Sequence, residues 1–146
     1  MELCLNYIRD WSVRSAFVLE GRSGAGKSQF LIQLMRQLNT LYKKKEEFKF
    51  IKVFYFRLRE FSEGYLELNK NQKSIEIQIK EQLKSAKNCK LLFLFDGYDE
   101  FNNKSVIIDR KIVSAEDFPD AKIILTSREK YASTSDYNRV FENSGY

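Results

Sequence analysis

The sequence predicts a layered α/β domain in which a mainly parallel sheet carries helices on both faces. Three observations lead to this fold class. Short apolar segments alternate along the chain with longer segments of helical periodicity, a pattern typical of strand–helix–strand units. The segment 53–56 is apolar on both faces, as in a strand that is covered on two sides. Gly21, Gly24 and Gly26 stand between the first apolar segment and the first helical one, and such clustering of glycine marks a special loop.

Each element in the first half of the chain has its own signal. The first predicted strand covers 16–19 and ends just before the glycine loop. A second strand is centred on 53–56, inside a region rich in aromatic and β-branched residues. Between the two strands the spacing of apolar residues predicts a helix. Its apolar stripe is formed by Phe30, Leu31, Leu34, Met35, Leu38 and Leu41.

The second half of the chain continues the alternation. We predict a helix over 74–87, where Glu, Gln and Lys favour helix although the isoleucines at its start alternate with polar residues. The apolar segment 91–95 predicts a buried strand, and 104–115 predicts a helix. Another buried strand follows at 123–125, and a last strand is predicted at 139–141.

Length and composition limit the class of protein. With 146 residues the chain has the length of one domain, and we expect a short N-terminal extension (1–15) before the domain itself (16–146). The longest apolar run, 91–95, is too short to span a membrane. Cys4 and Cys89 form neither a disulfide framework nor a zinc motif. We therefore expect a protein of the reducing cytoplasm.

Charge and residue usage narrow the chemistry further. The formal net charge is +5, and the basic run at 43–45 is followed at once by two glutamates, as at a solvated helix end. No stripe of aromatic and basic residues stands apart from the predicted core strands, so we do not expect a nucleic-acid partner. Because the chain contains no histidine, a His-based triad or a His-ligated metal within it is excluded.

Residues 21–28 match the phosphate-binding loop (Walker A) pattern G-x-x-x-x-G-K-[ST] in full. A buried strand precedes the motif and an amphipathic helix follows it, which is the context that the motif requires. Backbone N–H groups of the loop and of the helix start would surround phosphate oxygens. We expect Lys27 to reach the β and γ phosphates and the Ser28 hydroxyl to bind Mg²⁺. The expected nucleotide-binding residues are Gly21, Arg22, Ser23, Gly24, Ala25, Gly26, Lys27, Ser28 and Gln29.

An acidic cluster follows the apolar strand 91–95. Asp96 ends this strand, and the carboxyl ends of strands are where open α/β sheets bind ligands. We therefore expect Asp96 to lie near the Mg²⁺ held by Ser28, as a Walker B aspartate. Asp99 or Glu100 is expected to orient or deprotonate the attacking water. The alternative is that these acids only cap a helix and stabilise its first turn.

Arginines follow two of the other strands. Arg128 follows the apolar strand at 123–125, after the polar residues Thr126 and Ser127. If that strand lies beside the phosphate-loop strand, the guanidinium can sense or stabilise the charge of a γ-phosphate. Arg57 and Arg59, at the end of the second strand, are weaker candidates, for which an exposed strand-end charge is the simpler interpretation.

In combination these segments resemble the NACHT family, in the signal-transduction (STAND) class of P-loop NTPases that includes the NOD-like receptors. The resemblance lies in FVLEGRSGAGKS (17–28), FYFRLREF (54–61), LLFLFDGYDEF (91–101) and KIILTSRE (122–129). It implies a three-layer P-loop NTPase core, ATP or ADP with Mg²⁺, a sensor arginine at Arg128 and a nucleotide-controlled oligomerisation switch. The helical and winged-helix domains that usually follow are not in this sequence, so we expect a core that is truncated before them.

The alternatives to this function differ in what happens to the nucleotide. A GTPase is not expected, because neither Asn-Lys pair of the chain continues into the base-reading motif N-K-x-D. A P-loop kinase has the same phosphate loop and stays open as an alternative. A nucleotide-binding interaction module without significant hydrolysis is the other alternative. We expect an adenine-nucleotide switch with slow ATP hydrolysis, and self-association or protein partners through further domains.

Overall fold

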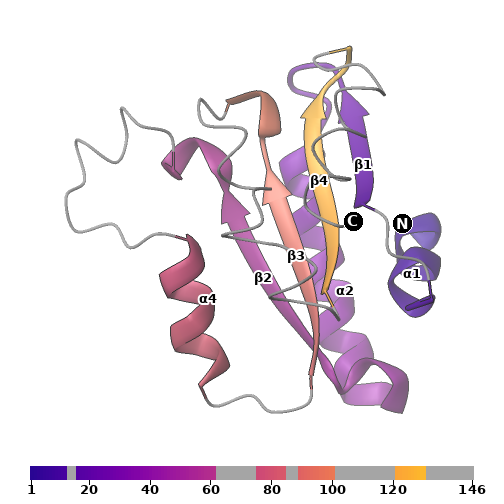
Figure 1. Cartoon of the computed structure of the whole chain (residues 1–146). Helices are drawn as coiled ribbons and strands as arrows, with labels where there is room; N and C mark the ends of the chain where they lie inside the picture. The colour runs from indigo at the N-terminus through magenta and orange to yellow at the C-terminus, as the bar shows by residue number, and fades with distance from the viewer. Residues whose placement is uncertain (13–15, 62–74, 85–88, 101–120, 131–146) are drawn as a thin grey trace.

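The four described strands form one parallel sheet, and they contain the segments that the sequence marks as apolar. This computed structural model describes residues 1–12, 16–61, 75–84, 89–100 and 121–130. The strands are β1 (Ala16–Gly21), β2 (Ile51–Arg57), β3 (Lys90–Asp96) and β4 (Ala121–Arg128). They pair in the order β1-β4-β3-β2, with every pair parallel (Figure 1). Each strand contains its predicted segment and extends it at one or both ends.

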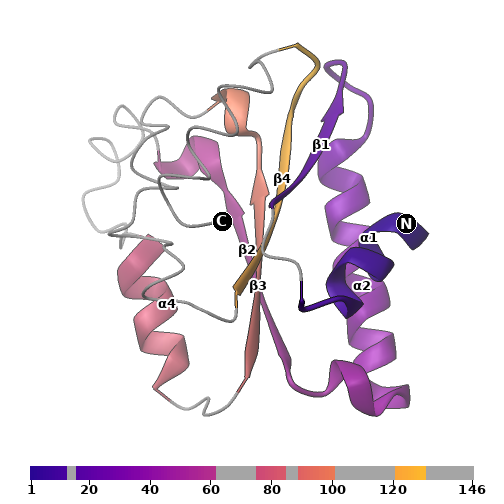
Figure 2. The same cartoon turned by 45° about the vertical axis from the view of Figure 1, so that its right-hand side comes forward.

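Helices cover both faces of the sheet. α1 (Glu2–Arg9) and α2 (Lys27–Lys44) lie on one face, and α4 (Ile75–Leu83) lies on the other (Figure 2). The predicted three-layer α/β fold is therefore confirmed. None of the helices among the described residues has both the length and the apolar character needed to cross a membrane.

Three predicted elements need comment. The helix predicted over 74–87 is shorter, because α4 ends at Leu83 and Lys84 already lies in a turn. The other predicted positions, 74 and 85–87, lie outside the described residues. The helix predicted at 104–115 and the strand predicted at 139–141 lie outside the described residues.

Alternating side chains of the strands pack into two separate cores, one on each face of the sheet, as the period of two in a β-strand requires. Leu92 and Leu94 of β3 pack with α1 and α2. Phe93 and Phe95 point to the opposite face and share a core with Ile79 of α4. The predicted apolar stripe of α2 is confirmed: its residues are buried (Leu31, Leu34, Leu38) or packed at the edge of the core (Phe30, Met35, Leu41).

α1 is part of the first of these cores. Its buried side chains are Cys4, Leu5 and Ile8. Lys122 of β4 is only 2% exposed and donates to the main-chain carbonyls of Tyr7 and Asp10 at the end of this helix, where a cation complements the helix dipole. The Tyr7 hydroxyl donates to the carbonyl of Ile123 at 3.0 Å. These hydrogen bonds attach α1 to the sheet, although the helix belongs to the segment that was expected as an N-terminal extension.

Candidate functional site

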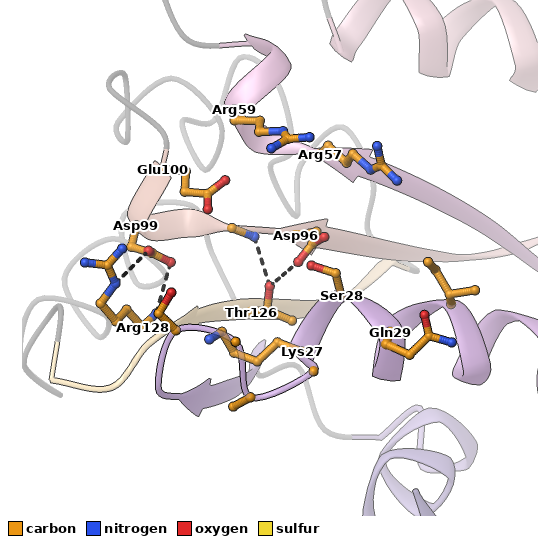
Figure 3. A pocket seen from close by; sticks show the side chains of 16 residues that line it. Lys27, Ser28, Gln29, Arg57, Arg59, Asp96, Asp99, Glu100, Thr126 and Arg128 are labelled. Atoms are coloured by element: carbon orange, nitrogen blue, oxygen red, sulfur yellow. Dashed lines mark hydrogen bonds and ion pairs between the residues drawn. The ribbon is translucent and has the colours of Figure 1, made fainter.

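A cavity of about 490 Å³ opens where the carboxyl ends of the parallel strands meet (Figure 3). This edge is where open α/β sheets bind their ligands. The lining residues come from the glycine loop, the start of α2 and the ends of β2, β3 and β4. They are residues 23–29, Ile32, Arg57, Arg59, Asp96, Gly97, Asp99, Glu100, Thr126 and Arg128. Of the predicted site residues, only Gly21 and Arg22 do not line the cavity, although both belong to the same loop.

The glycine loop connects β1 to α2 along one wall of the cavity. Gly24 and Gly26 have φ values of 76° and 82°, a left-handed conformation that glycine adopts without strain. Gly26 is also the N-cap residue of α2. The first turn of a helix has N–H groups without partners inside the helix and the positive end of the dipole. With no acidic residue in that turn of α2, the wall is suited to an anion such as phosphate.

Lys27 and Arg22 take different positions around this loop. The Lys27 ammonium donates to the carbonyls of Gly21 (2.7 Å) and Arg22 (2.9 Å), so it lies across the loop at the cavity wall. Arg22 instead forms an exposed ion pair with Glu129, with Nε 3.7 Å from Oε2. The structure therefore brings the side chain of Lys27 into the cavity and directs that of Arg22 towards the residue after β4.

Asp96 is the most enclosed carboxylate of the cavity. It ends β3, is 8% exposed and lies on the side of the sheet that α2 covers, facing Ser28 (Figure 3). Its Oδ1 accepts from the Thr126 hydroxyl at 2.7 Å, and its Oδ2 accepts from the Tyr55 hydroxyl at 2.9 Å. Thr126 Oγ1 in turn accepts from the Gly97 N–H at 2.9 Å. Asp96 and Ser28 thus come together as the sequence predicts.

The two acids after Asp96 have different surroundings. Asp99 accepts from the backbone N–H of Arg128 (3.0 Å) and pairs with its guanidinium, with Nε 3.4 Å from Oδ2. Glu100 is exposed, and no ion pair to it is found among the described residues. Its carboxylate folds back over Gly97, where a Cβ atom would come within 3.3 Å of Oε2. Arg128 therefore engages Asp99 and leaves Glu100 beside the open cavity.

Sequence reasoning underrated one group of residues and missed another. Arg57 and Arg59, the weaker candidates, both line the cavity. Tyr55 and Thr126 were not among the predicted site residues, yet both bind the Asp96 carboxylate. Thr126 carried a signal, because it is polar and follows an apolar strand. Tyr55 carried none, because only the pairing of β2 with β3 brings it to the face on which Asp96 lies.

The donor set fits Mg²⁺ bound together with a phosphate. Among the described residues no group of three or more His, Cys, Asp or Glu side chains forms a dedicated metal cage. Mg²⁺ is typically held by one or two protein oxygens, with water and phosphate oxygens completing the octahedron. The Asp96 carboxylate and the Ser28 hydroxyl are hard oxygen donors of this kind on facing walls of one cavity.

Comparison with known proteins agrees with this geometry. No curated protein matched the sequence. The family described as the NACHT domain matches residues 15–144, which is nearly the whole chain and covers all four described strands. Together with the parallel sheet and the phosphate-binding loop at its carboxyl edge, this match shows that the chain belongs to the NACHT family of nucleotide-binding P-loop NTPases.

Proposed function

We propose that this domain binds ATP with Mg²⁺, acts as a nucleotide-controlled signalling switch and hydrolyses ATP slowly. The observation that carries the proposal is the single cavity that gathers the phosphate loop, Asp96 and Arg128 at the carboxyl edge of the sheet. Family membership supports the nucleotide as ligand. The absence of N-K-x-D from the sequence favours adenine over guanine.

In this proposal different walls of the cavity bind the phosphates, the magnesium ion and the attacking water. The backbone of the loop 21–28 and the first turn of α2 bind the phosphates. Lys27 leaves the loop carbonyls to contact the β and γ phosphates, which is a charge-assisted contact. Ser28 and Asp96 hold the magnesium ion, which when bound neutralises phosphate charge. Glu100 orients or deprotonates the attacking water, and Asp99 is the alternative residue for this role.

The switch is proposed to depend on Arg128. Its guanidinium is held by the nearly buried Asp99 carboxylate while its own side chain stays 58% exposed at the cavity. A γ-phosphate in the cavity competes with Asp99 for this guanidinium, whereas the shorter ADP does not. The state of the ion pair thus reports which nucleotide is bound, and self-association or a protein partner in the cytoplasm would read that state.

Identification of the nucleotide that co-purifies with the protein tests this proposal. Denatured, freshly purified protein is analysed by ion-pair chromatography and mass spectrometry, with the Lys27→Ala variant as the control. We expect ADP or ATP with the wild type and little nucleotide with the variant. Recovery of GDP would overturn the adenine assignment, and equal recovery from both proteins would overturn the site.

Single-turnover measurements separate the proposed switch from its alternatives. With excess protein over labelled Mg-ATP, slow appearance of ADP and phosphate supports the NTPase. Binding with no detectable turnover would favour a nucleotide-binding interaction module. Transfer of the label to an added acceptor rather than to water would favour a P-loop kinase.

A further inference from the structure

The Asp96 carboxylate is held from both neighbouring strands. β3 lies between β2 and β4 in the sheet, and each neighbour contributes a hydroxyl group. Thr126 of β4 donates to Oδ1 at 2.7 Å, and Tyr55 of β2 donates to Oδ2 at 2.9 Å. The residue paired with Asp96 across the β2–β3 ladder is Arg57. Tyr55 therefore reaches the carboxylate diagonally, from two positions earlier on the same face of the strand.

We propose that Tyr55 is a positioning residue that fixes the Asp96 carboxylate for the magnesium of the bound nucleotide. This inference rests on the proposed function. One hydrogen bond to each oxygen holds both side-chain torsions of Asp96, and each oxygen keeps a lone pair for the metal or its water. Loss of a group that orients a metal ligand from outside typically lowers metal affinity by about 10–100-fold.

Thr126 cannot take over the role of Tyr55. Its single hydroxyl hydrogen is committed to Oδ1, and its oxygen already accepts from the Gly97 N–H at 2.9 Å. Within the described part of the chain, Tyr55 is the side chain that donates to Oδ2. Phenylalanine at this position would fill the same space but leave Oδ2 without that donor. The carboxylate could then rotate about the hydrogen bond to Thr126.

The test compares Tyr55→Phe with Tyr7→Phe. Both variants lose one hydrogen-bonding hydroxyl, but that of Tyr7 contacts the Ile123 carbonyl beside α1 rather than the cavity. Binding of a fluorescent ATP analogue is followed while Mg²⁺ is titrated, and again in EDTA. For Tyr55→Phe we expect the half-saturating Mg²⁺ concentration to rise about tenfold, with unchanged nucleotide affinity in EDTA. Tyr7→Phe should have the Mg²⁺ dependence of the wild type.

A double-mutant cycle shows whether Tyr55 acts through Asp96. In an Asp96→Asn background, Tyr55→Phe should cause no further change in the Mg²⁺ dependence. Mn²⁺ binding, followed by electron paramagnetic resonance, should likewise be weakened by Tyr55→Phe only when Asp96 is present. A full additional loss in that background would indicate a general structural role and overturn the inference. If the wild type binds the analogue with Mg²⁺ and Tyr55→Phe has the same Mg²⁺ dependence, only this inference fails. If the wild type binds no nucleotide, the proposed function fails first.

Discussion

Three carboxylates within five residues of the end of β3 differ in what surrounds them. Asp96 accepts from the hydroxyls of Tyr55 and Thr126, and Asp99 is held by Arg128. Glu100 lies over Gly97 at the cavity, as an exposed group. A general base needs a lone pair that is free to take a proton. The surroundings therefore favour Glu100 for that role over Asp99, a choice that the sequence left open.

Substitution of these acids should separate binding from hydrolysis. Glu100→Gln should keep Mg-ATP affinity and slow single-turnover hydrolysis by about 10²–10⁴-fold, since it removes the proposed base. Asp99→Asn is the matched control, and it should slow hydrolysis far less. Single-turnover measurements with protein in saturating excess over Mg-ATP give both rates. Slowed hydrolysis in Asp99→Asn with the wild-type rate in Glu100→Gln would reverse the two roles.

Arg128 should matter more for ATP than for ADP. Its guanidinium lines the cavity and pairs with Asp99, and we have proposed that a γ-phosphate displaces this partner. Arg128→Ala should reduce the ratio of ATP affinity to ADP affinity, and one charge-assisted contact corresponds to about 1.5–3 kcal/mol. Calorimetric titration with each nucleotide measures this ratio. Arg36→Ala, an exposed arginine of α2, is the control, and equal loss for both nucleotides in Arg128→Ala would argue against a γ-phosphate contact.

At the scale of the elements, the sequence predicted the strands and helix faces that depend on local patterns of apolar residues. The strand at 91–95 and the stripe containing Leu31, Leu34 and Leu38 are local signals, and the structure confirms both. The contact of Tyr55 with Asp96 depends on how β2 pairs with β3. α1 is hydrogen-bonded to a lysine of β4 more than a hundred positions away. A single sequence carries neither kind of information, because pairing and docking arise from contacts between distant segments.

Lys122 should determine how firmly α1 is held. Its ammonium binds the carbonyls of Tyr7 and Asp10 and lies 4.0 Å from the centre of the Tyr7 ring. Burial lowers the pKa of Lys122 although Asp10 opposes the shift. Desolvation of the ammonium therefore offsets part of the stabilisation that its hydrogen bonds provide. We expect Lys122→Met to lower the free energy of unfolding by about 1–2 kcal/mol, as measured by urea denaturation.

The rate at which the Cys4 thiol is labelled measures how often α1 separates from the rest of the domain. Cys4 belongs to the buried face of α1, and labelling in a Cys89→Ser background follows this thiol alone. Lys122→Met should speed the labelling because α1 opens more often. Lys52→Met is the matched control, since the Lys52 ammonium also binds a carbonyl, that of Gln82 at 2.8 Å, on the face with α4. Equal acceleration in both variants would mean that α1 does not depend on Lys122.

For the whole molecule, the cavity predicts that nucleotide stabilises the fold. A ligand that binds only the native state adds about 2.7 kcal/mol at a concentration one hundred times its dissociation constant. Mg-ATP should therefore raise the midpoint of thermal unfolding of the wild type. Lys27→Ala should show a much smaller rise, and Mg²⁺ alone should produce none in either protein. An equal shift in the two proteins would place the stabilising site outside the glycine loop.

The strand order also has a consequence for the nascent chain. β4 is the last described strand in the sequence, yet it lies between β1 and β3 in the sheet. Before β4 has been synthesised, β1 and β3 cannot be joined in one sheet. The edges of both strands that later pair with β4 are then unpaired. Such edges favour association with other chains, so we expect the chain to be most prone to aggregation in this interval. A chain that stops translation before residue 121 therefore has the glycine loop and Asp96 but cannot form this sheet.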